Sequence, residues 1–277
     1  MKIRMSVASE KGFTIIEVIL FFGITGLMIA GAFIGIGASI GNQRYRDSVE
    51  SFKSVIQQQY SDITNVYNAR EGVWTCQPGG SALSTNKVAE GTLYGTYRGQ
   101  SQCAVVGKYV TVNEAGLIRI QTVVSYKSGT PSGATEVLKM ASGAYTYGVT
   151  SSDAQESQME WGTRLRWPVG TDVADHRDAG ASGDPRRVAL LLIRSPENGG
   201  IFTFTSDNIS NTPDSTGLKA LMRDGAVIPG MAERLLCVDA SGMVSTPAQG
   251  IFIGANAADS SAVRVSTPAD FKVGERC

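Results

Sequence analysis

The chain has 277 residues, with 25 basic and 25 acidic side chains and a single histidine. This balance excludes the strong overall positive charge typical of many nucleic-acid-binding proteins, although it leaves a local basic patch open. The length suits one sizeable globular domain with an accessory element, or two small domains. Apolar residues are concentrated near the N-terminus, and the remainder is rich in Gly, Ser, Thr and Val in short alternating runs. We therefore expect an apolar N-terminal segment followed by a β-rich domain.

The apolar segment runs from Phe13 to Ile40 and carries one charge, Glu17. As a helix rising about 1.5 Å per residue, it is long enough to cross a hydrocarbon core of roughly 30 Å. Lys2, Arg4 and Lys11 precede it, which predicts a cytoplasmic N-terminus and a C-terminal domain outside the membrane. A secretory signal peptide does not fit, because its apolar region is about 7–15 residues long and its cleavage site follows that region. A plain signal anchor is the alternative interpretation.

Glu17 separates these interpretations. A carboxylate in a membrane helix costs about 2.5–3.5 kcal/mol at the bilayer centre and less near the edge, and it is usually retained for a partner. The run Lys11-Gly12-Phe13-Thr14-Ile15-Ile16-Glu17-Val18 resembles the processing site of type IV prepilins and related pseudopilins. In that family a membrane aspartyl peptidase cuts after the glycine and methylates the new N-terminus. The resemblance implies a leader peptide at 1–12, cleavage between Gly12 and Phe13, N-methylation of Phe13, and Glu17 as the fifth mature residue.

The chemistry of Glu17 agrees with this resemblance. Cleavage exposes an α-amine on Phe13 inside an apolar filament core, where the amine needs a counter-charge. A carboxylate one helical turn along is badly placed to neutralise the amine of its own chain, but it can meet the amine of a neighbouring subunit. We therefore expect Glu17 to set the axial register of assembly.

The segment departs from the family in one respect. Major pilins commonly carry a proline at the position that Ile34 occupies here. Glycines interrupt the helix instead, and each weakens a helix interior by roughly 1 kcal/mol while allowing close approach of helices in a membrane. Local melting on assembly is therefore left open. The glycines are Gly23, Gly26, Gly31, Gly35, Gly37 and Gly41.

Beyond the apolar segment, one apolar stripe continues at helical spacing. No proline occurs from Phe13 to Asn68, which predicts a single continuous helix. We assign 13–41 to a transmembrane or filament-core half and 42–70 to an amphipathic half that packs on a sheet. The stripe consists of Tyr45, Val49, Phe52, Ile56, Tyr60, Ile63 and Tyr67.

Residues 71–277 predict a β-rich globular head. Two hairpins are expected, Cys103–Val112 with Leu117–Tyr126 and Val188–Arg194 with Ile201–Thr205. The charged segment Asp175–Arg187 is expected to be an exposed loop. The resulting fold class is α+β, a long N-terminal helix whose amphipathic half lies on an antiparallel sheet. A terminal set of short strands is expected at Leu235–Asp239, Met243–Thr246, Ile251–Ile253 and Val263–Val265.

The four cysteines are Cys76, Cys103, Cys237 and Cys277. None forms a C-x-x-C pair and a single histidine is present, which argues against a zinc site. An even number in an exported chain favours disulfides, with three connectivities open. We favour Cys76–Cys103 and Cys237–Cys277 because each pair is local, and reduced thiols are the alternative.

No enzyme, metal or cofactor pattern is found, so we expect a non-catalytic protein without a cofactor. The one histidine, His176, lies in the charged loop and is expected to be solvated; the aspartates near it are Asp172, Asp175 and Asp178. Aromatic and arginine side chains could instead stack on single-stranded nucleic acid or a glycan, but a β-rich head uses the same residues to cover its sheet. These side chains are Tyr94, Tyr97 and Arg98 in one group, and Trp161, Arg164, Arg166 and Trp167 in another.

The resemblance implies a structural subunit of a type IV pilus that polymerises through its N-terminal helix into a surface filament for motility, adhesion or DNA uptake. The implied partners are other pilin subunits, the prepilin peptidase, the pilus assembly platform and, before assembly, membrane lipid. The implied location is a single-pass position in the inner or cytoplasmic membrane with the head outside, and then the extracellular filament. A type II secretion pseudopilin and a singly anchored, non-polymerising surface adhesin are the alternatives, and the sequence does not separate a major from a minor subunit.

Overall fold

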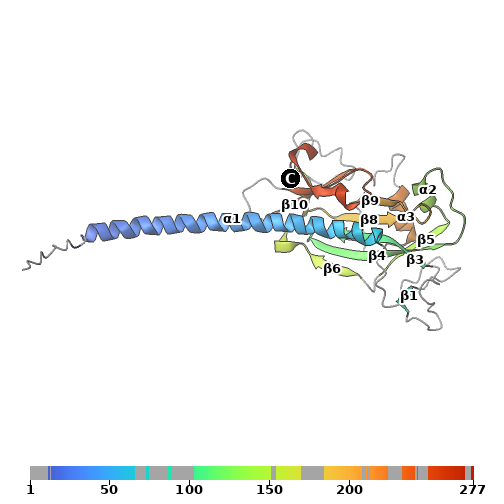
Figure 1. Cartoon of the computed structure of the whole chain (residues 1–277), viewed down its shortest axis with the longest axis horizontal. Helices are drawn as coiled ribbons and strands as arrows, with labels where there is room; N and C mark the ends of the chain where they lie inside the picture. Colours follow the sequence, from blue (N-terminus) through green and yellow to red (C-terminus); the bar gives the residue numbers. More distant parts are fainter. Residues whose placement is uncertain are drawn as a thin grey trace, which may run out of the picture.

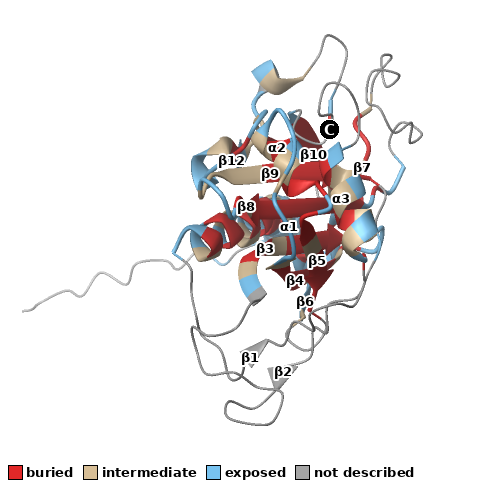
Figure 2. Ribbon diagram, turned by 90° about the vertical axis from the view of Figure 1, so that its right-hand side faces the viewer, coloured by how far each residue is buried: buried red, intermediate tan, exposed pale blue. Residues whose placement is uncertain are grey.

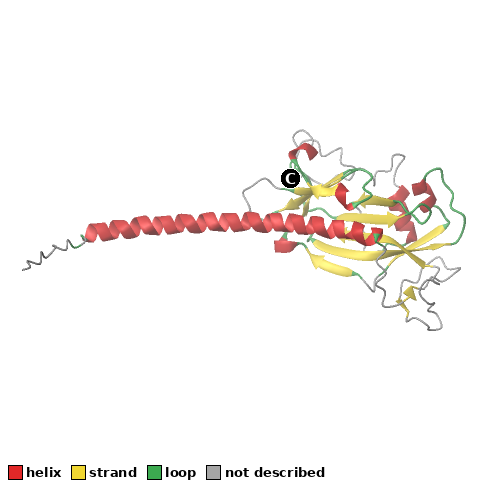
Figure 3. Ribbon diagram, in the orientation of Figure 1, coloured by secondary structure: helices red, strands yellow, loops and turns green. Residues whose placement is uncertain are grey.

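The chain folds as a long N-terminal helix joined to a β-rich head, so the predicted α+β class is confirmed (Figure 1). Helix α1 spans Ile15–Thr64, and its first half projects from the head while its second half lies along it (Figure 3). The computed structural model describes residues 12, 14–65, 73–74, 87–88, 103–150, 154–169, 184–207, 210, 213–223, 233–240, 242, 249–271 and 276–277.

Helix α1 is continuous over 50 residues and has side-chain and backbone caps at its ends. Thr14 is the N-cap, so the helix begins two residues later than the expected start at Phe13. At the other end the N–H of Asn65 donates to the carbonyl oxygen of Ser61 at 2.9 Å, which completes the last turn. The remainder of the predicted amphipathic half, 66–70, lies outside the described residues.

The larger sheet contains both predicted hairpins. Strands β3 (Cys103–Val112) and β4 (Leu117–Lys127) are antiparallel, as are β8 (Val188–Arg194) and β9 (Ile201–Ser206). The sheet has six strands in the order β5-β4-β3-β8-β9, and β6 also pairs with β4. Strands β5 and β6 are Tyr145–Val149 and Gln155–Gln158.

A second antiparallel sheet has four strands in the order β12-β11-β10-β7. We expected one sheet, and the described residues instead form two, besides a short ladder of β1 (Val73–Trp74) and β2 (Lys87–Val88). The predicted strand Met243–Thr246 lies outside the described residues. The four strands are β7 (Arg164–Arg166), β10 (Arg234–Asp239), β11 (Gly250–Ile253) and β12 (Val263–Val265).

The second half of α1 packs against both sheets. Figure 2 shows the buried residues gathered where the helix and the two sheets meet. The helix stripe shares one apolar cluster with Leu190 of the larger sheet and with Leu236 and Ile251 of the smaller sheet. Burial of such side chains is the main favourable contribution to folding. Six of the seven predicted stripe residues are buried, namely Tyr45, Val49, Phe52, Ile56, Tyr60 and Ile63, while Tyr67 lies outside the described residues.

The larger sheet is covered on its second face by two short helices. These are α2 (Glu136–Met140) and α3 (Ser215–Arg223), which pack Met140, Leu218 and Met222 into a separate apolar cluster. Three 3-10 turns complete the described elements: η1 (Glu160–Gly162), η4 (Ser260–Ala262) and η5 (Pro268–Asp270).

Candidate functional site at the N-terminal helix

Helix α1 begins with a capping box formed by Thr14 and Glu17. The backbone N–H and the hydroxyl of Thr14 both donate to Oε2 of Glu17 at 2.9 Å, and the N–H of Glu17 donates to the Thr14 hydroxyl at 3.3 Å. This arrangement satisfies N–H groups that the first helical turn leaves without a partner. Gly12 is exposed just before the cap, whereas Phe13 and residues 1–11 lie outside the described residues. The expected scissile bond, between Gly12 and Phe13, therefore lies one residue before the N-cap.

The capping box gives Glu17 a contact that the sequence analysis did not foresee. We considered only the α-amine of Phe13 and expected Glu17 to be badly placed to neutralise it within its own chain. The carboxylate instead turns back over one helical turn and reaches the N–H of Thr14, the residue next to Phe13. The signal was present, because Thr14-Ile15-Ile16-Glu17 matches the T-x-x-E pattern of a capping box.

The first half of α1 exposes its large apolar side chains on every side. Ile15, Leu27 and Ile34 are 78%, 77% and 76% exposed, and the exposed series ends at Ile40. By length and composition α1 is the one helix among the described residues that could cross a membrane. Removal of this surface from water requires a bilayer or neighbouring protein.

The glycines of this half make no close contact within the chain. A Cβ atom added at any of five glycines would find nothing within 4 Å, apart from the adjoining turns of the helix itself. Nor does Ile34, at the position of the family's proline, interrupt the helix. The five glycines are Gly23, Gly26, Gly31, Gly35 and Gly37.

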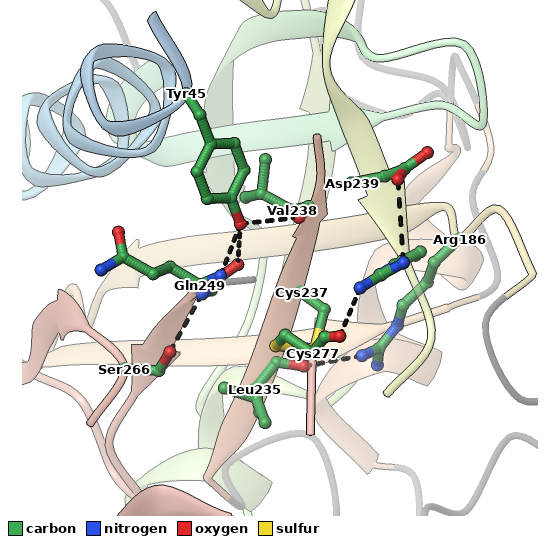
Figure 4. Close-up of a disulfide and its surroundings, with 11 residues drawn as sticks. Tyr45, Arg186, Leu235, Cys237, Val238, Asp239, Gln249, Ser266 and Cys277 are labelled. Atoms are coloured by element: carbon green, nitrogen blue, oxygen red, sulfur yellow. Dashed lines mark hydrogen bonds and ion pairs between the residues drawn. A yellow bond between two sulfur atoms is a disulfide. The ribbon is translucent and has the colours of Figure 1, made fainter. Parts of the chain in front are cut away.

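Tyr45 is the first buried residue of α1 and joins the helix to the smaller sheet (Figure 4). Its hydroxyl lies 3.0 Å from the carbonyl oxygen of Val238 and 2.9 Å from that of Gln249. The hydroxyl also accepts a hydrogen bond from the N–H of Gln249. Burial raises the pKa of Tyr45, since the phenolate would lose its hydration. At the junction between its exposed and buried halves, α1 is therefore held to the smaller sheet by the hydrogen bonds of Tyr45.

Three further polar contacts hold the buried half of α1. The hydroxyls of Ser48 and Thr163 lie 2.5 Å apart, beside η1. Nε2 of Gln57 donates to the carbonyl oxygens of Ser260 at 3.1 Å and Val263 at 2.8 Å. Such contacts fix the rotation of the helix more specifically than apolar packing does.

Nearer the end of α1, Tyr60 connects the helix to both sheets. Its hydroxyl lies 2.7 Å from that of Thr203 on β9, and the Thr203 hydroxyl donates to the carbonyl oxygen of Ala257 at 2.7 Å. Burial raises the pKa of Tyr60 to about 12. The helix, the larger sheet and the β11–β12 connection are therefore linked in one chain of hydrogen bonds.

The C-terminal segment is attached to the smaller sheet by a disulfide between Cys237 and Cys277 (Figure 4). Arg276 pairs with Val169 through two backbone hydrogen bonds of 2.8 Å, and Arg166 donates to the backbone oxygen of Cys277. This is the pairing that the sequence favoured for these two cysteines. The other favoured pair cannot be placed, because Cys76 and the side chain of Cys103 lie outside the described part of the chain.

Backbone close to this disulfide needs glycine at one position. A Cβ atom at Gly250 would lie 2.5 Å from the carbonyl oxygen of Leu236 and 3.0 Å from Sγ of Cys277. No other residue fits at that separation without a shift of the backbone. Strand β11 therefore lies too close to β10 and the disulfide at this position for any side chain to fit.

A buried ion pair lies between the two sheets, and no pattern in the sequence predicts it. Arg186 is 2% exposed and donates to Asp207 at 2.5 Å and 3.1 Å. Its guanidinium also donates to the carbonyl oxygen of Leu235 at 2.8 Å and lies 4.0 Å from the ring centroid of Trp167. The expectation of an exposed loop at Asp175–Arg187 is therefore wrong at Arg186, because its partners come from distant strands.

Of the second group of side chains that could stack on nucleic acid or a glycan, Trp161 is exposed and the other three are engaged within the head. Trp167 is buried beneath Arg186, and Arg164 and Arg166 form ion pairs with Asp239 at 3.1 Å and 3.7 Å. The described residues hold no group of three His, Cys, Asp or Glu side chains suited to a metal ion. The remaining predicted side chains lie outside the described residues: His176, Asp172, Asp175, Asp178, Tyr94, Tyr97 and Arg98.

The sequence predicted Tyr45 as the first residue of the buried stripe, but not the hydrogen bonds that join it to the smaller sheet. The signal for this position is the change from an uninterrupted apolar run to a periodic stripe, which occurs at Tyr45. Comparison with protein-family models, with curated proteins and with solved structures finds no match.

Proposed function

We propose that this protein is a type IV pilin-like structural subunit, processed after Gly12 and polymerised through its N-terminal helix. The observation that carries the proposal is the exposed apolar half of α1, which begins with a single carboxylate and directly follows the Lys11-Gly12-Phe13 sequence. A head fixed rigidly to the other half of the same helix suits a filament whose subunits stack through their helices.

The capping box gives Glu17 two roles in this scheme. In the unassembled chain its carboxylate accepts hydrogen bonds from Thr14 and stabilises the first turn of the helix. After cleavage, the α-amine of Phe13 would be one residue away from this cap. On assembly the carboxylate can exchange or share its Thr14 contact with the amine of a neighbouring subunit, and the buried ion pair then sets the register.

The decisive test is mass spectrometry of the full-length chain recovered from membranes of a host that contains a prepilin peptidase. We expect a mature N-terminus at N-methylated Phe13. Gly12→Val is the matched control, because the added side chain at the cleavage position should leave the leader attached while the head folds normally. An intact leader on the wild-type chain would overturn the proposal and leave a plain membrane anchor.

A secretion pseudopilin would share this processing and this helix. The two are separated by electron microscopy of sheared surface material and by the stoichiometry of the chain in it. Abundant chain in long surface filaments supports a pilus subunit. Confinement of the processed chain to the cell envelope would favour the pseudopilin.

A further inference from the structure

Trp161 in η1 combines high exposure with an unusual backbone conformation. Its side chain is 51% exposed, and its φ and ψ are 58° and 23°. The left-handed region is unfavourable for a bulky side chain, and such a residue persists only where the surrounding structure holds it there. The next residue, Gly162, is also left-handed with φ 71°. The turn thus holds an indole ring at the surface at an energetic cost.

The turn sits beside the point where α1 leaves the head. Ser51 of α1 donates to the carboxylate of Glu160 at 2.9 Å, so η1 is attached directly to the helix. The guanidinium carbon of Arg44 lies 4.6 Å from the ring centroid of Trp161, within the range of a cation–π interaction. Arg44 is the first charged residue after Glu17. Trp161 therefore lies at the boundary between the apolar half of α1 and the head.

The length of α1 places this boundary close to a membrane surface. The exposed apolar series from Ile15 to Ile40 covers about 39 Å, against roughly 30 Å for a hydrocarbon core. The headgroup layer adds about 5–7 Å on each side. Arg44 is four residues beyond Ile40, or about 6 Å along the helix axis. A helix longer than the core tilts, and tilt lowers one side of the head towards the lipid.

We propose that Trp161 and Arg44 together contact the headgroup layer of the bilayer that holds α1, with the indole ring at the interface and the guanidinium on lipid phosphate. Tryptophan suits this layer because its ring is apolar while its N–H can still reach a polar partner. Arginine binds phosphate through paired donors. This inference requires only that α1 spans a membrane, and it does not depend on polymerisation.

The test compares the full-length wild-type chain with Trp161→Phe in vesicles of phosphatidylcholine and phosphatidylglycerol. Part of the phosphatidylcholine carries bromine near the ester end of its acyl chains, where it quenches indole fluorescence at the interface. We expect the brominated lipid to quench the wild-type emission and Trp161→Phe to lose most of that quenching. Arg44→Gln leaves the indole in place, and we expect it to reduce the quenching and to increase acrylamide access to Trp161.

A matched control places an exposed tryptophan elsewhere on the head. Leu138 on α2 is 46% exposed, and Figure 1 shows α2 at the end of the head away from the projecting half of α1. In the Trp161→Phe background, Leu138→Trp should add fluorescence that acrylamide quenches and brominated lipid does not. This control separates contact with the interface from exposure alone.

Two results would overturn the inference. Equal lipid quenching of wild type and Trp161→Phe would show that Trp161 does not touch the bilayer. Protection of Trp161 from acrylamide that grows with the protein-to-lipid ratio, without lipid quenching, would show contact with a second copy instead. If lipid quenches Trp161 in a chain that never assembles, this inference holds and the proposed function fails. If lipid does not quench Trp161 in a chain that forms filaments, the proposed function holds and this inference fails.

Discussion

Tyr45 and Gln249 are hydrogen-bonded to each other although 204 residues separate them in the sequence. The tyrosine hydroxyl lies 2.9 Å from the carbonyl oxygen of Gln249 and also accepts from the N–H of the same residue. Both backbone groups at the entry to β11 are therefore satisfied by one side chain of α1. The relative placement of the projecting helix and the smaller sheet depends on this contact.

We expect Tyr45→Phe to lower the free energy of unfolding by about 1–3 kcal/mol, because it leaves the N–H of Gln249 without its acceptor. Urea unfolding of the full-length chain in detergent measures the change. Tyr126→Phe is the control, since the described residues offer its half-buried hydroxyl no hydrogen-bond partner, and its effect should be small. Equal effects of the two substitutions would remove the special role of Tyr45.

The Cys237–Cys277 disulfide joins residues 40 positions apart. In the chain-entropy model, closure of a loop of this length stabilises the protein by about 4 kcal/mol. We expect the double substitution Cys237→Ser with Cys277→Ser to lower the urea midpoint without abolishing the fold, because the apolar core is unchanged. A reductant should lower the wild-type midpoint by at least as much, because it would also break the expected Cys76–Cys103 bond. An unchanged midpoint in the double variant would contradict the prediction.

Removal of one partner from the buried Arg186–Asp207 pair should be severely destabilising. Asp207→Asn leaves the guanidinium of Arg186 in a buried site without a counter-charge, and we expect a loss of about 3–5 kcal/mol. The comparison is Glu156→Gln, which removes the half-exposed partner of Arg119 at 3.5 Å. That change should cost about 1 kcal/mol or less. Similar losses for the two variants would show that the buried pair makes no special contribution.

Stability should fall at alkaline pH because of Tyr60. Its pKa rises from 10.0 to about 12 on folding, so the folded state holds the phenolic proton more tightly than the unfolded state. The contribution of the protonated Tyr60 to the free energy of unfolding is complete below pH 10 and is lost as the pH rises towards about 12. Urea midpoints measured across this window should decline for the wild type. Tyr60→Phe should start from a lower midpoint and decline less, and an identical decline would exclude Tyr60 as the cause.

Two roles of Glu17 can be separated by substitutions in its capping box. Glu17→Gln keeps a capping oxygen but loses the charge, whereas Thr14→Ala loses the cap and keeps the charge. If the charge sets register, Glu17→Gln and Glu17→Ala should both be processed normally but poorly incorporated into filaments. Thr14→Ala should be incorporated much better. Immunoblots of sheared filaments and membranes measure the ratio, and normal incorporation of Glu17→Gln would refute the register role.

Local features of the fold could be predicted because their causes are local. The strands at Val188–Arg194 and Ile201–Ser206 are apolar or alternating runs joined by a glycine-containing turn, and the buried stripe of α1 follows from its helical spacing. The division into two sheets could not be predicted in this way. Strand β7 pairs Leu165 with Val238, and nothing near either residue in the sequence indicates that partner.

The same distinction applies to the candidate site. The Glu17 cap has a local pattern that can be recognised, and Tyr45 marks a change of pattern. By contrast, the burial of Arg186 depends on Asp207 and Leu235, which reach it only after the chain has folded. The strained Trp161 likewise has no distinctive sequence context apart from the glycine that follows it.

The glycines of the projecting helix are surrounded by open space, so nothing in the isolated chain explains why glycine stands at these positions. Alanine at Gly26 or Gly31 would meet no obstacle within the molecule and would strengthen the helix by roughly 1 kcal/mol at each site. The helix is therefore weaker than it needs to be, because nothing within the chain itself requires glycine at these positions. Whether an alanine methyl group fits at these five positions depends on the lipid or protein that surrounds the helix. Alanine substitutions there would therefore detect close neighbours that the isolated molecule does not contain.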